Sequence, residues 1–206
     1  MRHGLTVSHL RAFKANGRAF SPHKTHISAP LGTESSPTAF PFLRPDGVFP
    51  TPAPLEPGAL VEGRIDWPLR FSRMQGHSGE HILSGTVHRL FGYDNVGFHM
   101  GAEAMTLDFS VELGAQDVAL AELEANRAVW RDLPVNSLLP ASNELADMPY
   151  RSKKELSGRV RIVEIPGVDM CACCAPHVSH SGEVGLLKII DSMRHRGGTR
   201  LTLLCG

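Results

Sequence analysis

The chain has 206 residues, of which 42% are apolar and 20% are charged, and its 21 basic and 21 acidic side chains give a formal charge of zero. This length and composition are typical of a globular protein with one ordinary domain and at most a small appendage, and they exclude general disorder. The neutral charge removes the simplest argument for nucleic-acid binding, which is a strong basic excess. The sequence contains no apolar run of about 18 residues, so it predicts no membrane span.

The first part of the chain differs from the rest. Residues 1–44 hold six Lys or Arg and one acidic residue, and nine of the fifteen prolines lie between Pro22 and Pro57. Proline at this density excludes long helices and most central strands. We therefore predict a Pro-rich basic segment at 1–58, interpreted as the remnant of a small β subdomain, and a main domain at 59–206. A transit peptide is an alternative interpretation of the basic start, although Pro and Gly interrupt any long amphipathic helix there.

From residue 59 onward, apolar residues recur at strand or helix spacing. In chain order, the pattern predicts a strand at 59–66, a helix at 74–91, strands at 95–100 and 105–111, a helix at 116–133, a short strand at 135–139, a helical turn at 143–148, and strands at 159–165, 186–191 and 199–204. In the second helix, we expect the core-facing side to carry Ala119, Leu123, Trp130 and Leu133. This mixed order, without a regular βαβ repeat, favours an α+β fold layered around an antiparallel sheet.

Two histidines stand one helical turn apart in the first predicted helix, in His77-Ser-Gly-Glu-His81. This spacing places both imidazoles on one face, as two ligands of one metal ion require. By themselves, they are equally well interpreted as surface or capping residues.

A second cluster, Cys171-Ala-Cys-Cys-Ala-Pro-His177, repeats the four-residue spacing at Cys173 and His177. Four thiolate and imidazole ligands suit a tetrahedral zinc ion, and such a cluster does not make a disulfide framework. We therefore predict a zinc site formed by His77, His81, Cys173 and His177, which joins the helix to the C-terminal segment. Cys171 or Cys174 remains an alternative to Cys173.

The first motif also fits H-x-x-E-H, the inverted zincin pattern, with Glu80 as general base. This peptidase interpretation needs a downstream carboxylate ligand on a helix, for which Glu122 and Glu124 are the candidates. It leaves the Cys/His cluster unexplained.

Several segments together resemble a known family, namely the editing domain of alanyl-tRNA synthetase and its freestanding relatives, the alanyl-tRNA editing hydrolases. The editing domain of threonyl-tRNA synthetase is a more distant relative. The resemblance covers residues 63–206 and is carried by R-M-Q-G-H-S-G-E-H-I-L-S (73–84), N-V-G-F-H-M-G (95–101), M-T-L-D-F-S (105–110), the Cys173/His177 pair, H-V-S-H-S-G-E-V-G-L-L-K-I (177–189) and the final G-G-T-R-L-T-L-L-C-G.

The resemblance implies a two-layer α+β sandwich and a zinc site whose ligands match His77, His81, Cys173 and His177. It also implies hydrolysis in trans of the ester of mischarged tRNA, which removes serine or glycine from tRNA for alanine. Such a second site destroys errors that a synthetic site cannot reject by binding alone. The implied partner is the acceptor end of tRNA, in the cytoplasm, which agrees with clustered thiols and the absence of a secretory signal.

The residues that would act beside the metal are less well defined. Zinc polarises a carbonyl or lowers the pKa of a bound water, but four protein ligands are typical of a structural site. The candidate catalytic residues are Gln75, His99 and Asp108, and the candidate substrate-binding residues are Ser84 and His88. For His88, a role as a surface or packing residue is the favoured interpretation, whereas Asp108 is equally well interpreted as a structural hydrogen-bond partner.

Two departures from the family support an alternative function. Residues 1–62 lack the glycine-rich G-G-G-Q loop of relatives with an N-terminal subdomain, and Pro176 stands where relatives often carry Thr beside the final ligand. The alternative is a non-catalytic, zinc-stapled module that binds tRNA or another partner, with residues 1–44 contacting phosphates.

Overall fold

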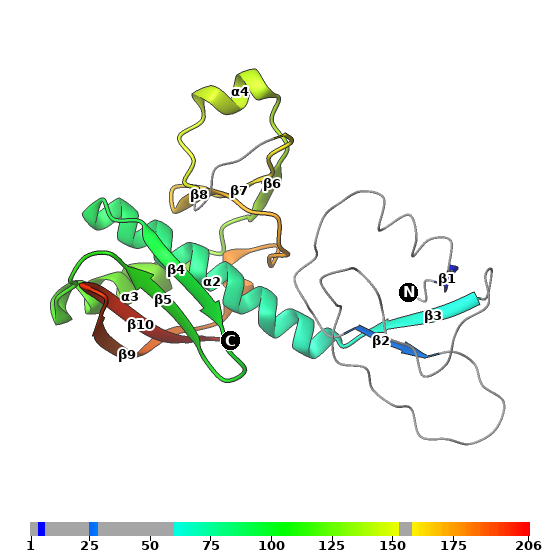
Figure 1. Cartoon of the computed structure of the whole chain (residues 1–206), viewed down its shortest axis with the longest axis horizontal. Helices are drawn as coiled ribbons and strands as arrows, with labels where there is room; N and C mark the ends of the chain where they lie inside the picture. The colour runs from blue at the N-terminus through cyan, green and yellow to red at the C-terminus, as the bar shows by residue number, and fades with distance from the viewer. Residues whose placement is uncertain (1–3, 7–24, 29–59, 153–157) are drawn as a thin grey trace. The chain divides into compact units, whose positions relative to one another are not determined.

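The computed structural model describes residues 4–6, 25–28, 60–152 and 158–206 (Figure 1). The chain divides into two compact units, Met1–Phe71 and Ser72–Gly206. The predicted division at residue 58 stays a prediction, and the Pro-rich stretch 35–57 lies outside the described residues.

In the first unit, three short strands form an antiparallel sheet in the order β1-β3-β2. They are β1 (Gly4–Thr6), β2 (Thr25–Ser28) and β3 (Leu60–Ile65), of which only β3 was predicted. Asp66 follows β3 and accepts a hydrogen bond from the Leu69 backbone N–H at 3.1 Å. This cap begins the helix α2 (Trp67–Phe91) seven residues before the predicted start.

The middle of α2 is the buried centre of the second unit. Every residue from Gly76 to Val87 is buried, and Ile82, Leu83 and Val87 are completely so. The helix ends at the predicted stop, where Gly92 has a φ of 76°.

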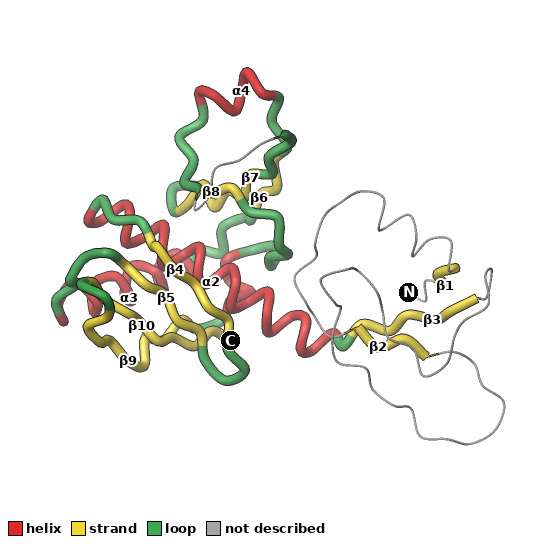
Figure 2. Tube along the Cα trace, in the orientation of Figure 1, coloured by secondary structure: helices red, strands yellow, loops and turns green. Residues whose placement is uncertain are grey.

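A four-stranded antiparallel sheet packs against α2. Its order is β4 (Asn95–Met100), β5 (Met105–Phe109), β10 (Gly198–Cys205) and β9 (Leu187–His195). Alternate side chains of the central strands, Leu107, Phe109, Leu201 and Leu203, are buried. Gly76 and Gly79 of α2 lie against Met105 and Cys205, so the helix approaches this sheet closely (Figure 2).

The helix α3 (Ala115–Trp130) lies beside β9 and presents a different face from the one predicted. The buried side is formed by Ala121, Ala125, Ala128 and Val129, whereas Leu123 and Trp130 are 42% and 65% exposed. The predicted orientation is therefore wrong for these two residues and for Ala119, which is also exposed. The physical reason is size, because small side chains let α3 approach the sheet, where Asn126 bonds both backbone groups of Leu187.

A second antiparallel sheet has the order β6 (Asn136–Leu138), β7 (Ile162–Ile165) and β8 (Asp169–Ala172). Of these, β8 was not predicted, because it is short and lacks a clear alternation. A turn through Pro166-Gly167, with a Gly167 φ of 70°, pairs β8 with β7. The short helix α4 (Ser142–Asp147) and the 3₁₀ turn η1 (Ser181–Val184) complete the described elements.

The described residues confirm the α+β class with helices and antiparallel sheets. The strict two-layer sandwich stays a prediction, since the strands are divided among separate sheets. Within the described ranges, none of the helices combines the length and the apolar character that crossing a bilayer requires.

Candidate metal centre

The predicted pairing of His77 and His81 on one face of α2 is present in the structure. Their ring centroids lie 5.1 Å apart, with the rings nearly perpendicular. Both residues lie in the buried middle of the helix, where His81 is only 2% exposed.

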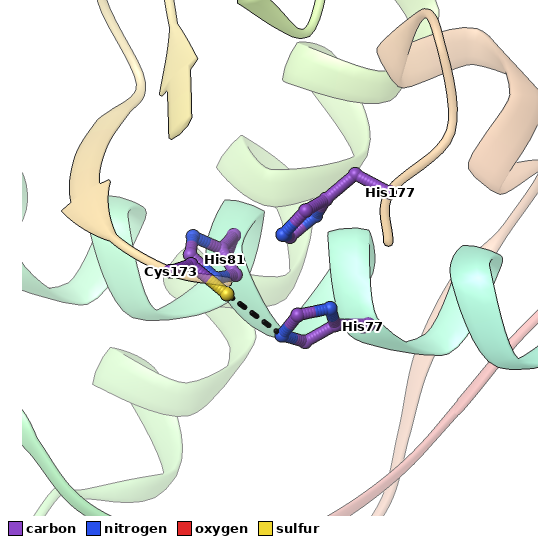
Figure 3. A group of neighbouring side chains, drawn as sticks. All are labelled: His77, His81, Cys173 and His177. Atoms are coloured by element: carbon purple, nitrogen blue, oxygen red, sulfur yellow. Dashed lines mark hydrogen bonds between the residues drawn. The ribbon is translucent and has the colours of Figure 1, made fainter. Parts of the chain in front are cut away.

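The segment after β8 brings Cys173 and His177 to the same place, although about ninety-five residues separate them from the two histidines (Figure 3). The His177 ring lies 4.1 Å from the His77 ring and 4.6 Å from the His81 ring, centroid to centroid. Cys173 Sγ lies 3.5 Å from His77 Nε2. One donor atom from each of the four residues lies within 4.8 Å of all the others.

Each histidine has a partner at its Nδ1 atom, on the side away from the cluster. His77 Nδ1 lies 3.0 Å from Pro176 O, His81 Nδ1 lies 2.8 Å from Asp169 Oδ2, and His177 Nδ1 lies 3.1 Å from Ser78 Oγ. When Nδ1 carries the proton and donates it to such an acceptor, the Nε2 lone pair is free for a metal ion. The segment between Cys173 and His177 therefore supports the cluster, because Pro176 supplies a backbone acceptor to His77.

The atom that most directly indicates a missing partner is His177 Nε2. It is buried and makes no hydrogen bond within the described residues. Buried polar atoms are nearly always satisfied, so a buried nitrogen facing a thiol and two imidazoles fits a metal ligand. The donor set of three nitrogens and one sulfur suits zinc.

The electrostatics of the cluster without a metal follow from burial and close contacts. Burial by itself would raise the pKa of the Cys173 thiol, but the surrounding histidines lower it to about 3. Burial opposes a charge on His81, yet Asp169, Cys173 and Glu80 raise its pKa to about 9. Burial lowers the pKa of His177 to about 3. The cluster thus favours a thiolate beside neutral His177, which is the form in which both residues bind a metal.

The alternative thiols have different positions. Cys174 is exposed and belongs to neither group of metal-ligating side chains found within the described residues. Cys171 is buried and lies with His81 and Asp169 in a second, adjoining group. The larger four-residue group contains Cys173, as the sequence predicted.

The inverted zincin arrangement has little geometric support. Glu80 is completely buried and accepts hydrogen bonds from Ser84 at 2.8 Å and Asn95 at 3.0 Å. Glu122 bonds the Ile189 backbone and Lys188, and Glu124 bonds Arg127. Within the described residues, neither helical carboxylate belongs to a group with His77 and His81.

Three further candidates lie on or near α2 but point to other partners. Gln75 Nε2 donates to Glu183 O at 2.9 Å, and Ser84 is the donor to Glu80. The His88 side chain is 49% exposed and lies 3.1 Å from Asp94. The structure therefore gives Gln75, Ser84 and His88 no direct contact with the four-residue cluster among the hydrogen bonds described.

His99 and Asp108 lie on the opposite side of the sheet from the helices. Phe98, whose ring stacks 6.0 Å from His77, faces the cluster, and strand alternation turns its exposed neighbour His99 away. Asp108 alternates with buried Leu107 and Phe109, and both its oxygens accept hydrogen bonds from Arg200 at 2.6 and 2.7 Å. The structure does not bring these two candidates to the cluster.

Sequence reasoning missed the residues that hold the cluster in place, namely Ser78, Asp169 and the Pro176 carbonyl. Ser78 lies inside the first motif, but neither its spacing nor its type indicates a contact with His177. Asp169 precedes the cysteine cluster by two residues, and this proximity was the available signal.

Comparison with known proteins agrees with the position of these motifs. Residues 160–201 match the family described as "Threonyl and Alanyl tRNA synthetase second additional domain". The chain is 31% identical over 168 residues to the "Alanyl-tRNA editing protein Aarsd1-B" of Xenopus laevis, which covers 79% of this chain and 40% of the relative. It is 32% identical over 154 residues to the "Alanyl-tRNA editing protein AlaX-L" of Pyrococcus horikoshii, covering 72% and 38%.

The chain is also similar to part of an aminoacyl-tRNA synthetase. The "Alanine--tRNA ligase" of Ignicoccus hospitalis is 33% identical over 150 residues, which covers 68% of this chain and 16% of the ligase. The chain thus spans about 40% of the length of the editing proteins that it matches. The chain thus contains a segment that matches the threonyl and alanyl tRNA synthetase second additional domain, and it is similar over most of its length to proteins named for alanyl-tRNA editing.

Proposed function

We propose that the chain is an aminoacyl-tRNA deacylase that hydrolyses the ester of mischarged tRNA for alanine, with serine and then glycine as the amino acids removed. The observation that carries the proposal is the cluster of His77, His81, Cys173 and His177 in a chain similar to proteins named for alanyl-tRNA editing. The proposed partner is the acceptor end of tRNA, in the cytoplasm.

The four residues would hold a zinc ion through three Nε2 atoms and the Cys173 sulfur. The buried, unbonded Nε2 of His177 supports this assignment. When bound, zinc supplies Lewis-acid chemistry, which polarises an ester carbonyl or lowers the pKa of water.

The chain's own residues orient the cluster. Pro176 O, Asp169 and Ser78 each hold the Nδ1 side of one imidazole, so the three rings have little freedom to turn. Ser78 Oγ also accepts the Val178 backbone N–H at 3.1 Å and thereby fixes the segment that follows His177. Phe98 beside His77 gives the cluster an apolar neighbour, which favours exclusion of water from one side.

A second candidate function is a non-catalytic zinc module that binds tRNA or a partner protein. Four protein donors favour it, since catalytic zinc sites usually keep a position open for water or substrate. In that case, the metal joins α2 to the C-terminal segment and contributes only to folding.

A deacylation assay with metal quantification separates the two functions. The full chain is incubated with seryl-, glycyl- and alanyl-tRNA for alanine, and with seryl-tRNA for serine and threonyl-tRNA as controls. We expect one zinc per chain and cleavage of the mischarged alanine tRNAs alone. Bound zinc without cleavage would favour the non-catalytic module, and absence of zinc would contradict both proposals.

The thiols offer a matched pair of variants for this assay. Cys173→Ser removes the proposed ligand, whereas Cys174→Ser changes an exposed neighbour outside the metal-ligating groups described. We expect loss of zinc and of cleavage only in the first variant.

A further inference from the structure

We propose that Asp169, held by Arg151, is the positioning residue that fixes the orientation and the protonated nitrogen of His81. The inference rests on the metal site proposed above and concerns the residues behind it. It assigns a role to two side chains that no motif of the sequence marks.

Among the described residues, each oxygen of Asp169 has one donor. His81 Nδ1 lies 2.8 Å from Oδ2, and Arg151 Nε donates to Oδ1 at 2.8 Å. The side chains of Asp169 and Arg151 are only 1% and 9% exposed. The carboxylate is therefore shared between the proposed ligand and a buried cation, with little access for water.

Arg151 is held in place by its backbone. Its N–H donates to Met170 O at 2.8 Å, and its carbonyl accepts the Ala172 N–H at 2.9 Å, so it pairs with β8 on both sides of Cys171. The strand that carries Asp169 and leads to Cys173 thus also fixes the arginine. A movement of β8 would displace all three residues together.

The network closes on the helix that carries His81. Arg151 donates to Asn95 Oδ1 at 3.2 Å, and Asn95 Nδ2 donates to Glu80 Oε1 at 3.0 Å. Glu80 is the residue before His81, so the hydrogen bonds run from the imidazole through β8 and β4 back to the same helical turn. Such a closed set of buried bonds allows one arrangement of its members.

The chemistry of the carboxylate explains why this position favours Asp. An ionised carboxylate only accepts hydrogen bonds, and the Arg151 guanidinium that donates to Oδ1 offers donors only. When His81 is neutral, as a metal ligand must be, its one proton is therefore held at Nδ1, and Nε2 is left with its lone pair toward the cluster. In Asp169→Asn, if the amide oxygen stays with Arg151, its NH₂ group faces His81 and favours the Nε2–H tautomer, which cannot bind a metal there.

Zinc affinity tests the proposal. The full chain, Asp169→Asn, Arg151→Met and the control Asp108→Asn, which alters the outer Asp–Arg pair, are titrated against a chromophoric zinc chelator. We expect Asp169→Asn to bind zinc roughly 10–100-fold more weakly, Arg151→Met to show a smaller loss, and the control to match the unaltered chain. Cobalt substitution adds a structural readout, and its visible absorption spectrum should change only in the first two variants.

The outcomes separate this inference from the proposal on which it rests. If the unaltered chain binds neither zinc nor cobalt, the metal site itself is wrong. If it binds both while Asp169→Asn shows the same affinity and spectrum, the positioning role is wrong.

A measurement on the unaltered protein covers the case in which the variants do not fold. Long-range ¹H–¹⁵N spectra of the zinc-loaded chain should show His81 bound through Nε2, with a slowly exchanging proton at Nδ1. Binding through Nδ1, or a rapidly exchanging Nδ1 proton, would overturn the proposal.

Discussion

The inner and outer sides of the C-terminal unit each contain an aspartate–arginine pair, and the two pairs differ in their contacts and in their surroundings. On the inner side, Asp169 is shared by Arg151 and His81, and both its side chain and that of Arg151 are almost completely buried. On the outer face of the sheet, Asp108 accepts two hydrogen bonds from Arg200, with side chains that are 23% and 32% exposed.

From this difference in burial, we expect the two pairs to contribute differently to stability. Water screens the outer pair, whose contribution to stability is therefore small. The inner pair cannot be rehydrated if one partner is lost, so breaking it leaves an uncompensated buried charge. The same contrast applies to apolar residues, since the alanines of α3 are buried while Trp130 is exposed.

We expect the largest loss of zinc affinity when one of the four proposed ligands is replaced. A structural zinc site is worth about 10–16 kcal/mol, so removal of one of four ligands should cost roughly 3 kcal/mol, or about 100-fold in affinity. We expect Cys173→Ser to show at least this loss in a chelator competition titration. Unchanged affinity would assign the sulfur ligand to another cysteine.

We expect a smaller loss of stability and of zinc affinity from Gly85→Ala, one turn after His81 on α2. A Cβ there would meet the Val168 carbonyl oxygen and lie 2.6 Å from Asp169 Cβ, so β8 would have to move away. We expect a loss of about 1–3 kcal/mol in the free energy of unfolding, measured by denaturant titration, and weaker zinc binding. Gly114→Ala, at the exposed start of α3, is the control and should leave zinc affinity unchanged.

The outer pair, Asp108 and Arg200, should make a modest and pH-dependent contribution to the free energy of unfolding. Hydrogen bonds from Arg200 lower the pKa of Asp108 below its ordinary value of 3.8. The pair's contribution is therefore present above that ordinary value and is lost as the pH falls through the lowered pKa. At pH 7, Asp108→Asn should lower the free energy of unfolding by less than about 1 kcal/mol.

The control for this prediction is to repeat the comparison of the two proteins at several pH values. Denaturant titrations at pH 7, 5 and 3 should show the difference between the two proteins narrowing toward the most acidic condition. A difference that grows on acidification would contradict the assigned direction of the pKa shift.

We expect the smallest change in the free energy of unfolding from a substitution on the exposed face of α3. Because Trp130 is 65% exposed, Trp130→Gln should change the free energy of unfolding by no more than about 0.5 kcal/mol. A thermal or denaturant unfolding curve measures this. A loss of several kcal/mol would show that the tryptophan packs in the core, as its helical spacing first indicated.

Much of the fold could be predicted from hydrophobic periodicity. The positions of β4, β5, β9 and β10 follow from alternation, and the end of α2 follows from Gly92. The beginning of α2 was available in principle, because Asp66 and Pro68 are helix-start residues. The orientation of α3 was not, since two apolar faces compete in its sequence and the close approach of alanines to the sheet is a tertiary effect.

The sequence by itself predicted the four proposed ligands, with Cys171 or Cys174 as an alternative to Cys173, because four-residue spacing in two motifs and the ligand preferences of zinc are local properties. Only the tertiary structure decided which residues support them. Ser78, Asp169 and Arg151 are common residue types, and apart from the proximity of Asp169 to the cysteine cluster their positions in the sequence give no signal. Their roles arise from the packing of β8 against α2. The same packing placed His99 and Asp108 on the far side of the sheet, because alternation assigns neighbouring side chains to opposite faces and only the fold determines which face meets the helix.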